Sequence, residues 1–149
     1  MARSLGYAVP CLSRAPTQMT ALGRLAFIAR GPGMWRRWAV GSTNVGDEHL
    51  VVTASPRALR SYAKVVNGPA WYASARVRPF AWVDLGGRRM RAVYVPPGTN
   101  DGSAFAHHVV LIWTEGQHTY GLGFHNVYGL RETFRLDEQL VRNVKLVAP

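Results

Sequence analysis

The chain has 149 residues, which suits a single domain and is long enough to bury a real hydrophobic core. Hydrophobic residues make up 48% of it and charged residues 17%, which excludes an intrinsically disordered chain, and no apolar run approaches the roughly 20 residues of a membrane-spanning helix. The formal net charge of +10 invites a nucleic-acid function, but the basic residues occur in short, scattered runs, which favours a solvated basic surface.

The N-terminal residues are small, polar and interrupted by proline without a clear period. We therefore predict an irregular arm over residues 1–20 and a single domain over residues 21–149. Cys11 is the only cysteine, which excludes an internal disulfide and a metal site built from several cysteines. The apolar core of a secretory signal, about 7 to 15 residues long, is not visible in this sequence. The compartment, the true start and the oligomeric state stay open.

Three short apolar segments precede the first predicted helix. The first is bounded on both sides by Gly- and Pro-containing turns, a pattern typical of a buried strand. The next two are separated by a connection that contains Gly46 and Asp47. The predicted strands are Arg24–Arg30, Trp35–Gly41 and His49–Ala54.

An internal helix is predicted from Pro56 to about Val66. Ser55 is a preferred N-cap residue, proline is favoured at the first helical position, and Gly68-Pro69 supplies the stop signal. One apolar stripe at helical spacing supports the prediction. It consists of Leu59, Tyr62, Ala63 and Val66.

A β-hairpin is predicted next, with arms Arg76–Leu85 and Arg88–Val95. Gly86-Gly87 closes it, a pair that permits the positive φ angles of a tight primed turn. Pro79 cannot donate to a strand ladder, so we expect its strand to lie at a sheet edge or to be bulged there. The segment from Pro96 to Gly102 is rich in turn-forming residues and is predicted to be a loop.

The clearest unit is a second hairpin within residues 107–126, because apolar side chains alternate along both of its arms. A four-residue loop from Glu115 to His118 would place Thr114 opposite Thr119, and a two-residue Glu-Gly turn is the alternative. The four-residue loop predicts the cross-strand pairs Trp113/Tyr120, Leu111/Leu122, Val109/Phe124 and His108/His125.

A terminal helix is predicted from about Asp137 to Leu146, after a connection over residues 126–134. Asp137 can cap it, and Leu136, Leu140, Val144 and Val147 form its apolar stripe. The whole pattern predicts an α+β fold: a mainly antiparallel sheet of about five to seven strands with one internal and one C-terminal helix.

The sequences WTEGQHTY and LDEQLVRNVKLV carry a weak resemblance that spans about residues 107–147. They resemble the C-terminal hairpin and helix of uncharacterised extracytoplasmic proteins of high-GC Gram-positive bacteria. The Trp-x-x-Gly-x-x-x-Tyr hairpin is more distantly similar to lipoprotein-carrier-like and anti-sigma-regulator-like sheet domains. The resemblance implies an antiparallel sheet that binds a lipid or a protein outside the cytoplasm.

Aromatic residues carry the main functional hypothesis. We expect a non-catalytic binding module without a cofactor, in which an aromatic cleft beside the Pro96 to Gly102 loop receives a hydrophobic or carbohydrate ligand or a protein partner. The alternative is that these rings simply fill the core. The residues assigned to the cleft are Trp71, Tyr72, Trp82 and Tyr94.

Two rival functions remain. The opposed pair His108 and His125 could share a metal ion in a metal-dependent hydrolase, although His49 and Asp101 are the only guesses for further ligands. None of the familiar hydrolase or nucleotide-binding motifs is present. A nucleic-acid binder is the second rival, but the Arg88-Arg89-Met90-Arg91 run falls at a hairpin turn, where a solvated charge cluster needs no partner.

Overall fold

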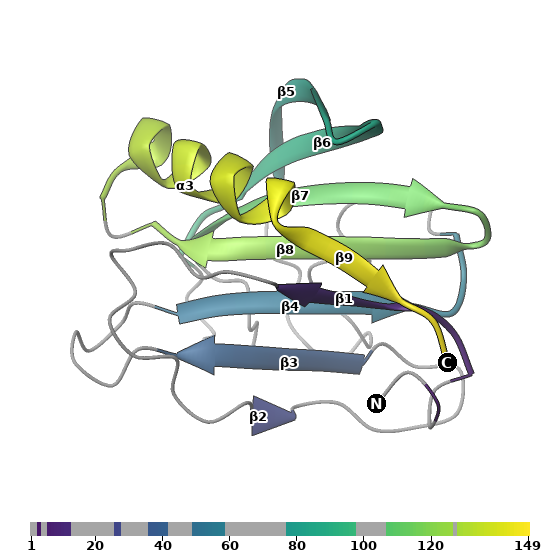
Figure 1. Cartoon of the computed structure of the whole chain (residues 1–149). Coiled ribbons are helices and arrows are strands. Elements are labelled where there is room, and N and C mark those ends of the chain that lie inside the picture. Colours follow the sequence, from purple (N-terminus) through teal and green to yellow (C-terminus); the bar gives the residue numbers. More distant parts are fainter. Residues whose placement is uncertain are drawn as a thin grey trace.

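The structure is a computed structural model that describes residues 3, 6–12, 26–27, 36–41, 49–58, 77–97, 107–126 and 128–149. In this part of the chain the strands form a large sheet and a two-stranded sheet, both antiparallel (Figure 1). This confirms the predicted α+β class. In spatial order, the large sheet contains β2 (Ala26–Phe27), β3 (Arg36–Gly41), β4 (His49–Ser55), β8 (His118–His125), β7 (His108–Glu115), β6 (Arg88–Val95) and β5 (Arg78–Leu85).

The β7–β8 hairpin occupies the middle of this sheet, between β6 and β4. Its register is the one predicted for the four-residue loop, with Glu115 opposite His118 and Gly116-Gln117 at the tip. Gly116 has a φ of 60°, at the first central position, where a type II′ turn takes glycine. The sequence pattern therefore predicted the hairpin, and the structure selects the first of the two registers that the pattern left open.

The β5–β6 hairpin also follows the prediction. Gly86 and Gly87 at its turn have φ angles of 57° and 76°, the left-handed values that a primed turn of type I′ requires. The register shifts between Pro79 and Ala81, and β5 stands at the end of the described strand order. Pro79 thus lies in a strand that is bulged and stands last in the described strand order. This position suits proline, because it has no backbone N–H to donate to a neighbouring strand.

The small sheet pairs β1 (Val9–Leu12) with β9 (Val144–Val147), and together with helix α3 (Leu130–Arg142) it packs on one face of the large sheet (Figure 1). This packing forms the main hydrophobic core. The other face of the central strands is buried as well, since Val110 and Ile112 are as inaccessible as their neighbours. The core includes Tyr7, Val9, Leu50, Val52, Met90, Leu111, Trp113, Tyr120, Leu122, Phe124, Leu136, Leu140, Val141 and Val144.

The C-terminal helix differs from the prediction at both ends. It begins at Leu130 rather than Asp137, and it ends at Arg142, so that Val144–Val147 is strand rather than helix. Asp137 is not a cap but a buried residue in the middle of the helix. The error arose because an acidic residue before an apolar stripe is a valid N-cap signal, while the actual cap, Gly129, has no capping side chain.

The predicted irregular arm also needs correction, because residues 9–12 of it form β1. Val9 is buried, and the Tyr7 hydroxyl donates a hydrogen bond of 3.4 Å to the Ala54 carbonyl oxygen. The Tyr120 hydroxyl donates one of 3.2 Å to the Ala8 carbonyl oxygen. This strand exists through its pairing with β9, a contact between the two ends of the chain that local sequence patterns cannot reveal.

The remaining predictions are tested only in part. Strand β2 falls inside the predicted strand at residues 24–30, and β3 and β4 confirm the next two. Ser55 Oγ accepts a hydrogen bond of 3.1 Å from the Arg57 backbone N–H, but residues 56–58 are not helical, so the predicted helix does not begin at Pro56. The predicted internal helix from residue 59 onward, and the loop from residue 98 onward, lie outside the described residues. Within the described part, no helix is long and apolar enough to cross a membrane.

Candidate functional site

The predicted aromatic cleft is not assembled by the two of its residues that the structure describes. Trp82 is exposed on β5 and lies opposite Arg91 of β6, so the two side chains share a face of the sheet. Tyr94 is three residues further along β6 than Arg91 and therefore points to the other face. Trp71 and Tyr72 lie outside the described residues. Trp82 and Tyr94 consequently do not line one surface.

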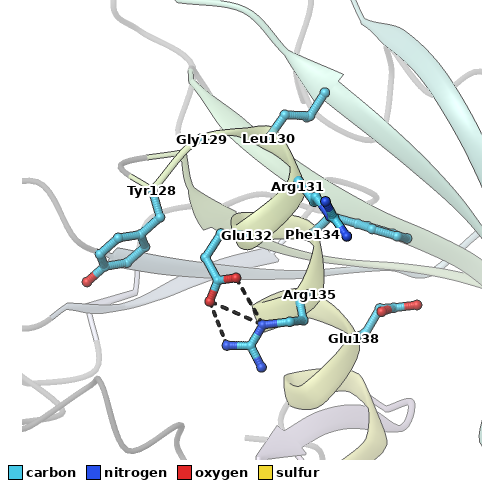
Figure 2. A pocket seen from close by; sticks show the side chains of 8 residues that line it. All are labelled: Tyr128, Gly129, Leu130, Arg131, Glu132, Phe134, Arg135 and Glu138. Carbon is cyan, nitrogen blue, oxygen red and sulfur yellow. Dashed lines mark hydrogen bonds and ion pairs between the residues drawn. The ribbon is translucent and has the colours of Figure 1, made fainter.

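A different hollow lies around the start of α3 (Figure 2). Its volume of about 750 Å³ falls within the range of about 300 to 1,000 Å³ that is typical of small-molecule sites. It is lined by Tyr128, Gly129, Leu130, Arg131, Glu132, Phe134, Arg135 and Glu138.

Exposed apolar side chains mark this hollow. Tyr128 is 44% exposed and Leu130 is 42% exposed, and both line it. Phe134 is half-buried and packs edge-to-face against Phe80, with ring centroids 5.4 Å apart, and Phe80 is itself 40% exposed. We call Phe80, Tyr128, Leu130 and Phe134 the α3 patch. An apolar patch that gathers several large side chains in one place is typical of an interaction site.

The helix leaves these residues outside the core because of its amphipathic pattern. Its buried residues follow helical spacing and face the sheet, whereas Leu130 and Arg131 at its start are exposed. Gly129, with a φ of 83°, turns the chain into the helix, and its carbonyl oxygen accepts a hydrogen bond of 3.0 Å from the Thr133 N–H. The side chains buried against the sheet are Thr133, Leu136, Asp137, Leu140 and Val141.

The charges at the hollow are unequally paired. Arg135 donates to both carboxylate oxygens of Glu132, with distances from 2.6 to 3.2 Å (Figure 2). These hydrogen bonds lower the pKa of Glu132 below its usual value. Arg131 is exposed and forms no ion pair with the residues that the structure describes. Among the described residues, the hollow thus offers apolar surface beside Arg131 and Glu138, neither of which forms an ion pair.

Polar atoms without hydrogen bonds lie beneath the same helix. Both carboxylate oxygens of Asp137 are buried and make no hydrogen bond of good geometry. Removal from water raises the pKa of Asp137 well above its usual value, and the Phe124 backbone N–H offsets this only in part. Thr133 Oγ1 and Trp113 Nε1 are likewise buried and form no hydrogen bond with the residues that the structure describes. Nothing in the sequence indicated that Asp137 would be buried, because it has the pattern of a cap.

The histidines gather at one end of β7 and β8, as the register predicts. His108 and His125 are directly opposed, with ring centroids 5.0 Å apart and nearly parallel planes. His107, whose φ is 58°, places its ring 5.0 Å from that of His125 in an edge-to-face arrangement. Burial, and then the proximity of His125, lower the pKa of His107 below its usual value. His108 is fully buried.

A metal centre at these histidines remains a prediction. Among the residues that the structure describes, no group of three or more His, Cys, Asp or Glu side chains is arranged to hold a metal ion. Of the two suggested additional ligands, Asp101 lies outside the described residues, and so does the side chain of His49. The pairing of His108 with His125 is confirmed, but a ligand set is not assembled around it.

Similarity to known proteins adds no constraint to this geometry. Comparison with protein-family models, curated proteins and solved structures found no match to the chain.

Proposed function

We propose that the protein is a non-catalytic binding module, and that the hollow at the start of α3 receives a small amphipathic ligand with an apolar body and an anionic head group. The α3 patch carries this proposal, because Tyr128 and Leu130 line the hollow with more than 40% of each residue exposed, and Phe80, 40% exposed, packs on the lining residue Phe134. Covering apolar surface is favourable by about 25 cal/mol per Å², so a ligand that covered these side chains would gain affinity directly.

The head group is inferred from Arg131. Its guanidinium stands at the hollow without an ion-pair partner among the described residues, while Arg135 is engaged by Glu132. A carboxylate or phosphate on the ligand would form a charge-assisted hydrogen bond with Arg131. The resemblance of residues 107–147 to extracytoplasmic sheet domains implies a lipid or a protein as ligand, and its lipid alternative supports the same ligand class and a location outside the cytoplasm.

A titration with laurate, followed by backbone amide NMR shifts, tests the proposal. We expect saturable shifts at Leu130 and Phe134. Leu130→Ala should weaken binding about 3- to 10-fold, because apolar contact is lost. Val147→Ala is the matched control, since it shortens a similarly exposed apolar side chain on β9, which does not line the hollow. Equal losses in the two variants would contradict the assignment.

A second comparison isolates the head group. Arg131→Gln should weaken laurate binding but leave the binding of dodecanol, which has the same chain and no charge, within about twofold. If neither compound binds and a panel of neutral oligosaccharides does, the ligand is a carbohydrate and the anionic head group is wrong. If the amide signals of the residues that line the hollow shift only when a protein partner is added, the small-molecule proposal fails.

A metal-dependent hydrolase is the second candidate, and the stacked pair His108/His125 supports it. Zinc bound by imidazole lowers the pKa of a coordinated water and supplies a nucleophile. Protein purified without chelator should then carry about one transition metal per chain, and His125→Ala should lose it. Metal content that is independent of His125 would exclude this candidate.

A further inference from the structure

An exposed tryptophan on the β5–β6 hairpin is flanked by two arginines. Trp82 is 52% exposed, and the guanidinium carbons of Arg89 and Arg91 lie 4.9 and 5.0 Å from the centre of its ring. Arg91 is the cross-strand partner of Trp82, and Arg89, two residues before it, points to the same face. We call these three residues the Trp82 surface.

Within the described part of the chain, the charges of Arg89 and Arg91 have no ion-pair partner. Arg88, on the same strand, donates to Glu115 at 3.0 Å, whereas neither Arg89 nor Arg91 forms a salt bridge with any residue that the structure describes. This holds even though Asp84 stands opposite Arg89 in the register. Arg91 Nε is buried and makes no hydrogen bond. Of the three arginines at this turn, Arg88 is therefore neutralised by Glu115. Arg89 and Arg91 have no ion-pair partner among the described residues and can bind an anion.

The chemistry of these groups defines what they can hold. A guanidinium resting on an indole keeps the N–H groups at its edges free to bind phosphate oxygens. The part of Trp82 that stays exposed beside the two guanidinium groups, 52% of the residue, offers apolar surface on which a nucleobase can stack. Phosphates and bases that alternate at short spacing are found together in single-stranded nucleic acid.

We propose that the Trp82 surface binds single-stranded nucleic acid, with phosphates at Arg89 and Arg91 and a base stacked against Trp82. The formal net charge of +10 would strengthen the encounter over the whole molecule. A duplex is a poorer fit, because its bases are already stacked and present no free face to an exposed ring. This inference does not depend on the α3 hollow.

The geometry of strand β5 makes an extended peptide a poor ligand for the Trp82 surface. A peptide adds to a sheet by continuing the hydrogen-bond ladder of an edge strand. Strand β5 is bulged between Pro79 and Ala81, and Pro79 lacks an N–H, so part of its ladder is unavailable.

Fluorescence anisotropy with a labelled oligothymidylate of about 12 nucleotides provides the test. We expect binding that weakens steeply as the salt concentration rises from about 50 to 200 mM. Trp82→Ala should weaken binding about 5- to 100-fold, because the stacking of one base is lost. Trp82→Phe should restore part of the affinity, because phenylalanine also offers an aromatic ring. Arg89→Gln/Arg91→Gln should reduce the steepness of log K against log salt by about 1.4, the effect of two lost phosphate contacts on a single strand.

The control removes the same charge elsewhere. Arg142 and Lys145 are exposed at the end of α3 and on β9, and Arg142→Gln/Lys145→Gln should keep the affinity within about twofold. Equal losses in the two double variants would overturn the proposal, because net charge alone would explain binding. A duplex of the same length binding as tightly, a polyglutamate peptide competing as well as the oligonucleotide, or unchanged binding by Trp82→Ala would overturn it too.

Discussion

At the scale of single residues, Asp137 is the costliest group in the described core. Its carboxylate is fully buried between α3 and the sheet and makes no hydrogen bond of good geometry. A buried polar group without a partner costs about 1 to 3 kcal/mol, and a charged one costs more. The protein avoids the charge by raising the pKa of Asp137, so the carboxyl holds its proton where an exposed one would lose it.

This shift predicts how stability depends on pH. Above the usual carboxyl pKa, near 3.8, the folded state binds more protons than the unfolded state, so the free energy of unfolding falls as pH rises toward the raised pKa. Asp137→Asn removes that dependence. In urea melts we expect the variant to have the same free energy of unfolding as the wild type at about pH 4. At about pH 8 its free energy of unfolding should be higher by roughly 1 to 3 kcal/mol.

Asp84→Asn serves as the comparison for this prediction. Asp84 is exposed on β5, so its replacement should change stability by less than about 0.5 kcal/mol at either pH. A stability gain in Asp137→Asn that is the same at both pH values would show that proton binding at this carboxyl is not responsible.

A second prediction at this scale compares the two faces of the central hairpin. Trp113 is buried in the core beside Tyr120, with ring centroids 5.4 Å apart, so Trp113→Ala should cost about 3 to 5 kcal/mol. His125 is only half-buried, and His125→Ala should cost less than about 1 kcal/mol. Denaturant melts compare the two. A larger cost for His125→Ala would point to a metal or a polar network at the sheet end.

At the scale of elements, the turn of the β5–β6 hairpin depends on conformation rather than on space. Gly87 has a φ of 76°, and a Cβ added there would meet nothing within 4 Å. Gly87→Ala should therefore destabilise the protein by about 1 to 2 kcal/mol through backbone strain alone. Gly87→Asn should cost less, because Asn tolerates the left-handed region. Thermal melts in which Gly87→Asn is less stable than Gly87→Ala would contradict this explanation.

Helix α3 shows how one element serves two purposes. Its buried stripe attaches it to β7 and β8, and its residues Leu130 and Phe134 contribute to the α3 patch. The same amphipathic period therefore explains both the core and the candidate site. The helix begins seven residues earlier than Asp137, and five of the residues that line the hollow belong to this additional part.

At the scale of the whole molecule, stability should be greatest in the middle of the large sheet. Leu111 and Leu122 face each other in β7 and β8, which are paired on both sides and buried on both faces. Their amides should exchange with solvent most slowly, near the rate of global unfolding. The amides of β1 and β9, in a two-stranded sheet formed by the chain ends, should exchange faster. Native-state hydrogen exchange measures both, and protection at Val147 equal to that at Leu111 would refute this ranking.

The sequence by itself determined the strands and turns of the large sheet. A period of two and the glycine pair are local properties, so the faces of β7 and β8, the turn at Gly86-Gly87 and an edge or bulged position for Pro79 all follow from neighbouring residues. The opposition of His108 and His125 followed from the same register.

Tertiary structure decided everything that depends on contacts between distant segments. Strand β1 forms because β9 lies beside it, and α3 begins at Leu130 because the large sheet accepts Thr133 and Asp137 as buried residues. Trp82 and Tyr94 were separated by strand alternation, whereas Phe80 met Phe134 through the packing of a helix on a sheet edge. Local patterns specify which face a side chain takes, but only packing determines what lies against that face.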